Sequence, residues 1–380
     1  MKILLVHNIY KTHNIGGEDI VFQQELRSLR KKLGEENVFE YTESNDDINL
    51  LKLFFSSWFS LKNYRNVYKI VKENNIDIVH VHNFFPLITP SIFKAAHKAG
   101  AKVVHTLHNY RLWCISGILY NKIKGVHEEC AKKDFAWECV KNKCYHDSWI
   151  QSFFMECLFW FYKKLKLFDF IDYYFVLTEF EKKKVISFGL AEKKVILKPN
   201  IVDVDYKNIE KENYYVYVGR LVEDKGVIDL LHVWSKLNNK FKLILIGGGE
   251  LEAELKEKYN KENIIFKGNC SREETLEIIG RAKYLLQTSL LYETFGLTII
   301  EAMTQGVPVI GNNLGTRPDF IKDCVNGFLY EKDNMQEVIE KSYNYLDYPR
   351  LIEEAFKTAQ NFTEVKIINK QIEIYNNILK

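Results

Sequence analysis

Charged residues stand directly after apolar runs in the second half of the chain, where they could do chemistry. Arg220 and Lys225 follow the run Tyr215–Val218, and Glu293 and Glu301 lie eight residues apart, with Glu301 expected in the first turn of a helix. Guanidinium and ammonium groups at a strand end suit a diphosphate, and paired carboxylates accept hydrogen bonds from sugar hydroxyls. Ordinary interpretations also fit, because basic residues after a strand are commonly solvated and a first-turn glutamate stabilises a helix dipole.

Three consecutive glycines are a second candidate for anion binding. Gly247, Gly248 and Gly249 stand between the apolar run Leu243–Ile246 and a helical pattern. A strand followed by glycines and a helix can present helix N-terminal amides to an anion, although a plain tight turn has the same sequence. The spacing is not that of the G-x-G-x-x-G dinucleotide fingerprint.

The elements that must position these residues are short apolar runs that alternate with helical patterns. The runs predicted as strands are Ile3–Val6, Ile78–Val81, Val103–Leu107, Tyr174–Leu177, Tyr215–Val218, Leu243–Ile246, Ile264–Phe266, Tyr284–Gln287 and Val307–Ile310. Most are continuous rather than alternating, as in parallel strands buried on both faces. We therefore predict an α/β fold with two Rossmann-like, doubly wound domains.

The alternation of strands and helices restarts after Pro199–Asp203, which indicates a domain boundary. We predict an N-terminal domain over residues 1–199 and a C-terminal domain over 200–361. An amphipathic helix over 362–380 is expected to pack back toward the N-terminal domain. The two domains are expected to face each other across a cleft at their strand C-termini, where open α/β sheets bind ligands.

Composition limits the classes of protein that the chain can belong to. The 380 residues are 47% hydrophobic and 27% charged, which excludes a disordered protein. The most apolar patch, Cys157–Tyr162, is far shorter than the ~20 residues of a spanning helix, and Met1–Val6 is too short for a signal-peptide core. We therefore expect a cytoplasmic protein. Residues 1–200 hold 30 basic and 22 acidic residues, a balance of +8 that favours an anionic partner for this half.

The order of these motifs resembles the GT-B glycosyltransferases of family GT4. The motifs that carry the resemblance are Gly219-Arg220, Lys225-Gly226, Gly247–Gly249, Glu293 to Met303 and Gly306–Ile310, with Gly16-Gly17, Val79–Asn83 and Thr106–Tyr110 in the first half. The resemblance spans essentially the whole chain. It implies a GT-B fold and retaining transfer of a hexosyl-type group from a nucleotide-diphosphate-sugar to a saccharide or lipid-linked acceptor, in surface polysaccharide biosynthesis. No nucleic-acid partner is expected.

Carried over residue by residue, the resemblance implies that Arg220 and Lys225 hold the donor diphosphate and that Glu301 bonds the ribose. Glu293 and nearby amides would position the donor sugar, and His108 would lie beside that sugar on the acceptor side. The predicted catalytic residues are His108, Arg220, Lys225 and Glu293, and the predicted donor-binding residues are Gly17, Gly219, Arg220, Lys225, Gly248, Glu293, Phe295, Gly296, Leu297 and Glu301.

The segment Gly315–Asp319 departs from the family pattern, which commonly has a second glycine and a glutamate there. No DxD-type motif stands at a plausible strand end, so we expect metal-independent catalysis in which cationic side chains offset the charge of the leaving group. Two alternatives stay open. One is another GT-B enzyme, an epimerase or a phosphorylase, and the other is a non-catalytic protein that binds nucleotide-sugars.

Four of the seven cysteines fall within residues 114–144, in a segment with little periodic pattern. A polar insertion of this kind is expected to bury little apolar surface and therefore to need another stabilising interaction, such as a metal site or a disulfide. His127 and Cys130 have the spacing of a metal-binding pair. The sequence predicts a structural zinc site formed by Cys114, His127, Cys130 and Cys144, with Cys139 and His146 as spare candidates; reduced packed thiols or a disulfide are the alternatives.

Aromatic residues are mixed with lysines in two segments of the first half, residues 51–61 and 159–168. This mixture suits a membrane interface, although packing helices with lysines at their edges have it too. Together with the basic balance of this half, it predicts peripheral contact with the inner face of the membrane.

Overall fold

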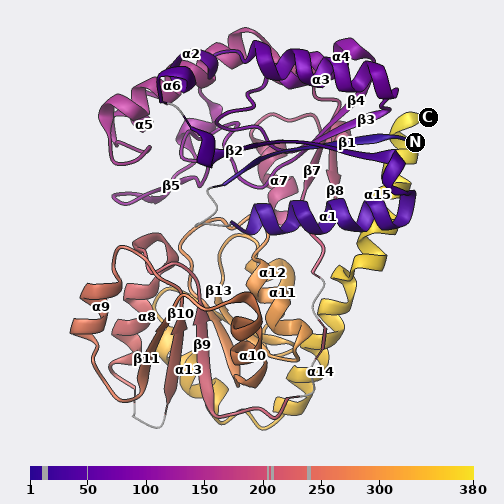
Figure 1. The fold of residues 1–380 in the computed structure, drawn as a ribbon. Helices are drawn as coiled ribbons and strands as arrows, with labels where there is room; N and C mark the ends of the chain where they lie inside the picture. Colours follow the sequence, from indigo (N-terminus) through magenta and orange to yellow (C-terminus); the bar gives the residue numbers. More distant parts are fainter. Residues whose placement is uncertain (11–15, 49, 203–204, 207–208, 238–240) are drawn as a thin grey trace. The chain divides into compact units, whose positions relative to one another are not determined.

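The structure is a computed structural model that describes residues 1–10, 16–48, 50–202, 205–206, 209–237 and 241–380. The chain forms two compact units (Figure 1). Unit 1 comprises Met1–Leu119, His127–Ile201 and Glu364–Lys380, and unit 2 comprises Tyr120–Val126 and Val202–Thr363. The division after Ile201 lies close to the predicted boundary after residue 199, and Asp203 lies outside the described residues. That residues 120–126 group with unit 2 was not predicted.

Six parallel strands form the sheet of unit 1, in the order β2-β1-β3-β4-β7-β8. They are β1 (Ile3–Ile9), β2 (Val38–Ser44), β3 (Ile78–Asn83), β4 (Lys102–Thr106), β7 (Tyr173–Val176) and β8 (Val195–Leu197). The interior strand β1 pairs with β2 and β3, with Ile3 opposite Val38 and Ile78. Its apolar run is fully buried because helices cover both faces of the sheet.

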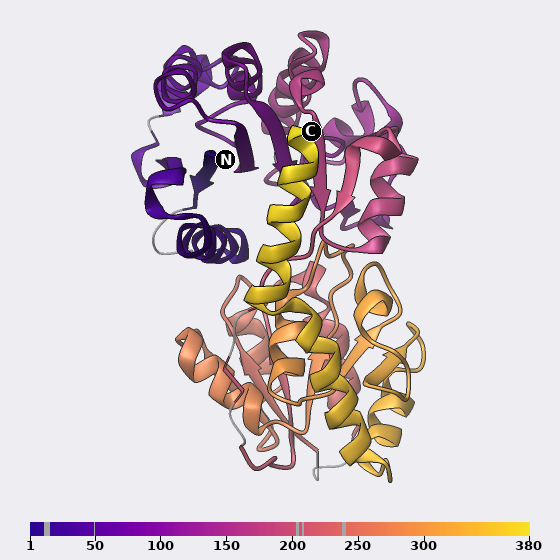
Figure 2. The same ribbon diagram turned by 90° about the vertical axis from the view of Figure 1, so that its right-hand side faces the viewer.

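The helices of unit 1 are α1 (Gly17–Leu33), α2 (Leu50–Ser56), α3 (Leu61–Asn74), α4 (Ser91–Ala99), α5 (Trp137–Lys141), α6 (Trp149–Lys164), α7 (Glu179–Ser187) and α15 (Glu364–Leu379). Helix α15 lies along the sheet of unit 1 (Figure 2). Ile367, Ile368 and Tyr375 of α15 share a buried core with α1 and with residues of β1, β3, β4 and β7. The amphipathic pattern of the tail therefore belongs to a helix that completes unit 1.

The cysteine-rich segment between β4 and α6 holds little regular structure. It contains the two-residue strands β5 (Tyr120–Asn121) and β6 (Gly125–Val126), a short 3-10 helix at Glu129–Lys132, and α5. The expectation that this segment buries little apolar surface is wrong. Ile115, Cys130, Ala136 and Cys139 are buried in one core with the inner face of α6.

Six parallel strands also form the sheet of unit 2, in the order β11-β10-β9-β12-β13-β14. They are β9 (Tyr214–Val218), β10 (Lys242–Ile246), β11 (Ile264–Gly268), β12 (Tyr284–Gln287), β13 (Val309–Asn312) and β14 (Gly327–Tyr330). This is the strand order of a doubly wound dinucleotide-type domain, which reverses direction between its first and fourth strands. In unit 2 that switch point lies between β9 and β12.

The helices of unit 2 are α8 (Val227–Trp234), α9 (Glu252–Lys258), α10 (Arg272–Arg281), α11 (Leu297–Thr304), α12 (Arg317–Phe320), α13 (Met335–Tyr343) and α14 (Tyr348–Ala359). Trp234 at the end of α8 is fully buried and packs edge-on against Tyr215 of β9. Its indole donates to the Phe241 carbonyl at 3.2 Å, so this large side chain buries no unpaired donor.

Candidate active site

The loop after β9 places Arg220 and Lys225 at the switch point of unit 2. The amide of Gly219 donates to the Ile246 carbonyl at 3.0 Å, and the amide of Leu221 donates to the Gly248 carbonyl at 2.9 Å. Between these two anchors, the Arg220 side chain is exposed. The backbone is therefore fixed while the guanidinium stays available to an anionic ligand.

The loop after β12 is joined to the loop after β9 at the same switch point. The Thr288 hydroxyl donates to the Lys225 carbonyl at 2.8 Å, and the Leu290 amide donates to the Asp224 carbonyl at 2.9 Å. Gly226 adopts a left-handed φ of 69°, and a Cβ there would overlap the Thr288 carbonyl. Only glycine permits this close approach.

Lys225 and Glu293, predicted as separate contributors to the site, form an ion pair. The Lys225 ammonium lies 2.6 Å from Glu293 Oε1, and the two side chains are 22% and 20% exposed. Burial by itself raises the pKa of Glu293, but Lys225, a hydrogen bond from Ser289 and the Arg317 guanidinium together lower it to about 2. The carboxylate is therefore ionised, and the pair presents a fixed cation beside a fixed hydrogen-bond acceptor.

Arg317, in the segment that departs from the family pattern, supports the Glu293 loop. Its side chain is fully buried and donates to the carbonyls of Ser289 and Leu291 at 2.8 and 3.1 Å. Burial lowers the pKa of this guanidinium to about 10, which leaves it charged at neutral pH. Sequence reasoning missed this role, because a buried arginine and a solvated one look alike in a loop sequence.

The second carboxylate, Glu301, lies on α11 but not in its first turn. The helix begins at Leu297, so Glu301 is its fifth residue, and the predicted first-turn position is wrong. Burial raises the pKa of Glu301, and Arg272 of α10, 3.0 Å away, opposes that rise.

Between Glu293 and Glu301, the residues predicted to bind the donor can contact a ligand through their main chain rather than through their side chains. The Phe295 ring packs edge-on against Phe320 and Phe362, so only its main chain could meet a ligand. Gly296 precedes α11 with a left-handed φ of 85°, and Leu297 is the first helical residue. The helix therefore begins within the segment expected to face the donor sugar.

The glycine triplet supports the Arg220 loop. A Cβ on Gly247 would overlap the Gly219 carbonyl, and one on Gly249 would overlap the Leu221 carbonyl. Helix α9 begins only at Glu252 and has seven residues. These contacts fit a tight turn better than a helix N-terminus that binds an anion, and Gly248 contributes its carbonyl to the Leu221 amide.

In unit 1, His108 follows β4 and contacts a buried relay of polar groups. His108 Nε2 lies 3.0 Å from His82 Nδ1, and His82 Nε2 lies 3.2 Å from Glu25 Oε1. Burial lowers the pKa of His82 to about 3, so its ring is neutral. Since the Glu25 carboxylate only accepts, His82 carries its proton on Nε2 and accepts at Nδ1, which requires that His108 donates from Nε2.

Glu25 is the centre of this relay, and no motif in the sequence pointed to it. Lys198 forms a fully buried ion pair with its second oxygen, and Gln371 of α15 donates to the first. Burial raises the pKa of Glu25, but Lys198, His82 and His80 lower it well below its usual range. A lone glutamate on a helix and a lysine after a strand are ordinarily solvated, so their pairing could not be read from the chain.

Gly17 is the first residue of α1, and residues 11–15 before it lie outside the description. The Gly16 amide donates to Asp19 Oδ2 at 2.9 Å, and Asp19 Oδ1 lies 2.7 Å from His7 Nε2. The amide at this helix start is thus already bonded to a carboxylate.

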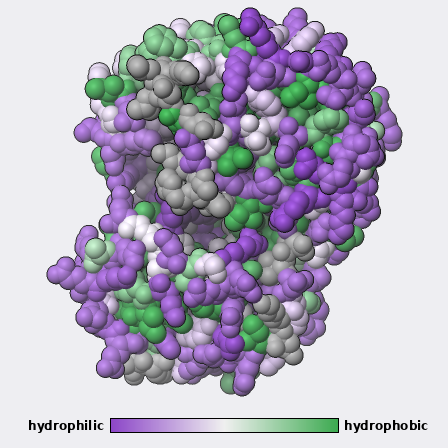
Figure 3. Space-filling model, in the orientation of Figure 1, coloured by the Kyte–Doolittle hydropathy of each residue, from purple (hydrophilic) through white to green (hydrophobic). Residues whose placement is uncertain are grey.

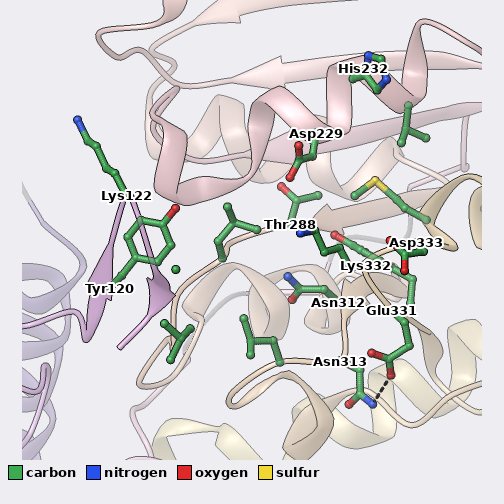
Figure 4. Close-up of a pocket in the computed structure, with 17 residues that line it drawn as sticks. Tyr120, Lys122, Asp229, His232, Thr288, Asn312, Asn313, Glu331, Lys332 and Asp333 are labelled. Atoms are coloured by element: carbon green, nitrogen blue, oxygen red, sulfur yellow. Dashed lines mark hydrogen bonds between the residues drawn. The ribbon is translucent and has the colours of Figure 1, made fainter. Parts of the chain in front are cut away.

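Unit 2 also contains a cavity of about 570 Å³ that was not predicted (Figure 4). It is lined by the β5–β6 hairpin, by Asp229 and His232 of α8, and by the loops after β12, β13 and β14. Asn313 donates to Glu331 at 2.8 Å at its edge (Figure 4). Thr288 lines it and also bonds the Lys225 carbonyl, so the cavity adjoins the loop that carries Lys225, although none of the predicted donor-binding residues lines it.

In the described part of the chain, only Glu25, His80 and His82 form a group of three metal-type ligands within 4.8 Å of one another. The Lys198 ammonium already supplies a cation to this group. Over the same residues, no helix is long and apolar enough to cross a membrane.

Two six-stranded parallel sheets, with charged loops at the switch point of the second, define a protein of the GT-B class. The solved structure of Anabaena Alr3699/HepE in complex with UDP and glucose matches with a TM-score of 0.69 over 99% of this chain and 100% of that one, at 16% identity. Residues 202–363 match the family Glycosyl transferases group 1, and residues 36–206 match Glycosyltransferase Family 4. The chain is a glycosyltransferase of the GT4 type.

Two relatives extend this finding. An uncharacterized 41.2 kDa protein in the cps region of Klebsiella pneumoniae is 25% identical over 82% of this chain and 82% of that protein. The capsular polysaccharide biosynthesis glycosyltransferase CapM of Staphylococcus aureus is 26% identical over 51% of this chain, and the match spans 54% of CapM.

Proposed function

We propose that this glycosyltransferase transfers a hexosyl group from a nucleotide-diphosphate-sugar to a saccharide or lipid-linked acceptor, with retention of anomeric configuration, during surface polysaccharide biosynthesis. One observation carries the donor assignment: Lys225 and Glu293 form a pair at the switch point of unit 2, with the exposed Arg220 on the adjoining loop. Open α/β sheets bind their ligands at this position. The neighbour solved with UDP and glucose supports the donor class, and the relative CapM, named for capsular polysaccharide biosynthesis, supports the process.

Arg220 and Lys225 bind the diphosphate in this proposal, and Glu293 accepts hydrogen bonds from the donor sugar. The bond between the anomeric carbon and the phosphate oxygen breaks, and the acceptor oxygen bonds to that carbon on the same face. The acceptor proton passes to the departing phosphate oxygen. The two cationic side chains stabilise the charge that develops on the diphosphate, so turnover is expected to survive treatment with EDTA.

Glu301 accepts hydrogen bonds from the ribose hydroxyls, and Arg272 holds it in place beforehand. Ribose binding favours the ionised carboxylate, whose pKa is raised by burial. Affinity for the nucleoside diphosphate is therefore expected to increase as the pH rises through that pKa.

A thermal-shift screen of UDP, GDP and ADP and of their hexose conjugates tests the donor assignment. A donor that binds only the folded protein raises the melting temperature in proportion to the logarithm of its concentration. NMR of the anomeric proton of the product then decides between retention and inversion. No shift with any nucleoside diphosphate would contradict the proposal.

A patch of exposed apolar side chains on α2, α5 and α6 supports peripheral contact with a membrane that holds a lipid-linked acceptor. The members of this aromatic patch are Phe54, Phe55, Trp137, Trp149, Ile150, Phe153 and Trp160. Phe54 stacks on Phe154, which joins α2 to α6, and hydrophobic residues are visible among hydrophilic ones over these helices (Figure 3). Exposed lysines on α6, such as Lys164, add attraction to anionic lipid.

Sedimentation with anionic phospholipid vesicles tests this membrane contact. Binding should fall as salt rises, because its electrostatic part is screened. Replacing Phe55, 74% exposed, with serine should weaken binding, whereas Leu346→Ser, at a residue 98% exposed in unit 2, should not. Equal loss in both variants, or no binding at all, would contradict the proposal.

A further inference from the structure

The cavity of unit 2 has a polar lining that the donor assignment does not use. Its volume of about 570 Å³ lies within the range of about 300–1,000 Å³ that is typical of small-molecule sites. The residues that line it carry three carboxylates, two ammonium groups, two amides, three hydroxyls and one imidazole. This set can both donate and accept hydrogen bonds, as the hydroxyl groups of a sugar do.

Two buried polar atoms of this lining make no hydrogen bond with any described residue. Tyr330, at the end of β14, is 3% exposed, and its hydroxyl has no partner. Asn312 Oδ1 has none either, although the nitrogen of the same amide donates to the Ser289 carbonyl at 2.9 Å. A buried polar atom without a partner destabilises the folded protein. A ligand that brings hydroxyl groups to Tyr330 and Asn312 would supply the missing partners.

The β5–β6 hairpin supplies an aromatic ring to one side of the cavity. Tyr120 points from the hairpin toward α8 and the loop after β12 (Figure 4). Burial raises the pKa of Tyr120, and the charges of Glu223, Asp224 and Asp229 raise it further, so these carboxylates lie near the phenol. An aromatic face packs against the C–H groups of a pyranose ring while carboxylates accept hydrogen bonds from its hydroxyls.

We propose that this cavity binds an uncharged sugar unit of the acceptor saccharide, an inference that rests on the proposed transfer to such an acceptor. Thr288 lines the cavity and its hydroxyl donates to the Lys225 carbonyl at 2.8 Å, so the cavity adjoins the loop assigned to the diphosphate. An acceptor has to lie near the donor to receive its sugar. None of the predicted donor-binding residues lines the cavity, so the donor's own sugar is expected elsewhere.

Two other classes of ligand fit this lining less well. A phosphate group would meet three carboxylates against two ammonium groups. A metal ion needs several ligands in one shell, and in the part of the chain that the structure describes, no group of three metal-type ligands within 4.8 Å of one another lies at this cavity. The predicted zinc ligands are not brought together as such a group either; they are Cys114, His127, Cys130 and Cys144.

Saturation-transfer NMR of the full-length protein tests the proposal, with the methyl pyranosides of glucose, galactose, mannose and N-acetylglucosamine as probes. We expect saturation of the ring protons of at least one probe, and a titration then gives its affinity. Tyr330→Phe should weaken this affinity about two- to tenfold without lowering the melting temperature, because the hydroxyl that it removes has no partner. Asp229→Ala, at an exposed residue of α8, should weaken it as well.

Tyr215→Phe is the matched control. The Tyr215 hydroxyl is also buried in unit 2 but lies 3.0 Å from Ser342 Oγ. Its removal should lower the melting temperature and leave the affinity for the sugar unchanged.

Three results would overturn the proposal. The first is no saturation transfer to any of the four probes while a nucleoside diphosphate still raises the melting temperature, which would leave the proposed function standing. The second is an affinity that neither Tyr330→Phe nor Asp229→Ala changes, because the probe then binds elsewhere. The third is displacement of the probe by a nucleotide-sugar but not by its nucleoside diphosphate, because the cavity then holds the sugar of the donor.

Discussion

Replacing Lys225 with methionine removes the ammonium group that lies 2.6 Å from the Glu293 carboxylate. The pKa of Glu293 falls from 4.5 to about 2 in the folded protein, and at about 1.4 kcal/mol for each pH unit this difference corresponds to roughly 3 kcal/mol. Without Lys225, burial is opposed only by Ser289 and Arg317, so the pKa should rise. We therefore expect Lys225→Met to lower the free energy of unfolding at pH 7 by up to about 3 kcal/mol.

The stabilisation that Lys225 provides should decrease as the pH falls. Because the folded pKa lies below the unfolded one, the stabilisation is complete above about pH 4.5 and is lost as the pH falls toward 2. The difference between wild type and Lys225→Met should therefore shrink from about 3 kcal/mol at pH 7 to about 1–2 kcal/mol at pH 3. Urea unfolding at the two pH values measures both quantities.

Lys256→Met is the matched control. Lys256 lies 2.6 Å from Glu252 as well, but the two side chains are 46% and 29% exposed on α9. An exposed pair of this kind contributes about 0.3–0.5 kcal/mol. Turnover should fall about 100-fold or more in Lys225→Met and stay unchanged in Lys256→Met. Equal, small effects of the two substitutions on stability, with normal turnover in both, would refute the reasoning.

Three further outcomes are expected. Arg220→Ala should reduce turnover about 100-fold or more with little change in melting temperature, because the side chain is exposed; a normal rate would remove it from the donor site. Glu301→Gln should weaken binding of the nucleoside diphosphate itself, whereas Glu293→Gln should weaken only its sugar conjugate, and calorimetry that gives the reverse order would exchange the two roles. Glu25→Gln breaks a buried ion pair and should cost about 3–5 kcal/mol, whereas Glu181→Gln should cost much less in urea unfolding, since burial raises the pKa of Glu181 well above its usual range.

Eight of the nine runs predicted as strands belong to interior strands of the two six-stranded sheets, and the ninth, Ile264–Phe266, belongs to the edge strand β11. Every predicted run overlaps a strand of the structure, because continuous apolar runs are typical of the interior of a parallel sheet. The strands of the two six-stranded sheets that were missed are β2, β8 and β14, which all lie at a sheet edge, and the two-stranded β5–β6 sheet was missed as well. Strand β2 was missed because it keeps polar residues and is mostly half-exposed, whereas β8 and β14 are apolar but have only three and four residues.

The sequence predicted individual residues of the candidate site, but not the contacts that they make with one another. Arg220 and Lys225 were found because they follow the central strand β9, where a sheet opens onto its ligand. The pairing of Lys225 with Glu293 depends on how two distant loops meet at Gly226 and Thr288, which no local pattern encodes. The burial of Arg317 and Glu25 depends on neighbours far along the chain, and it was missed for the same reason.

Unit 1 is built from segments that come before and after unit 2 in the sequence. This order constrains when unit 1 can finish folding during synthesis. Gln371 and Tyr375 of α15 bond Glu25 and His80 in the interior of unit 1. A ribosome releases these residues only after it has synthesised all of unit 2. During that interval unit 2 can fold, whereas the apolar surface that α15 covers stays open to proteases and chaperones. Completion of the core of unit 1 therefore requires that the whole of unit 2 has already been translated.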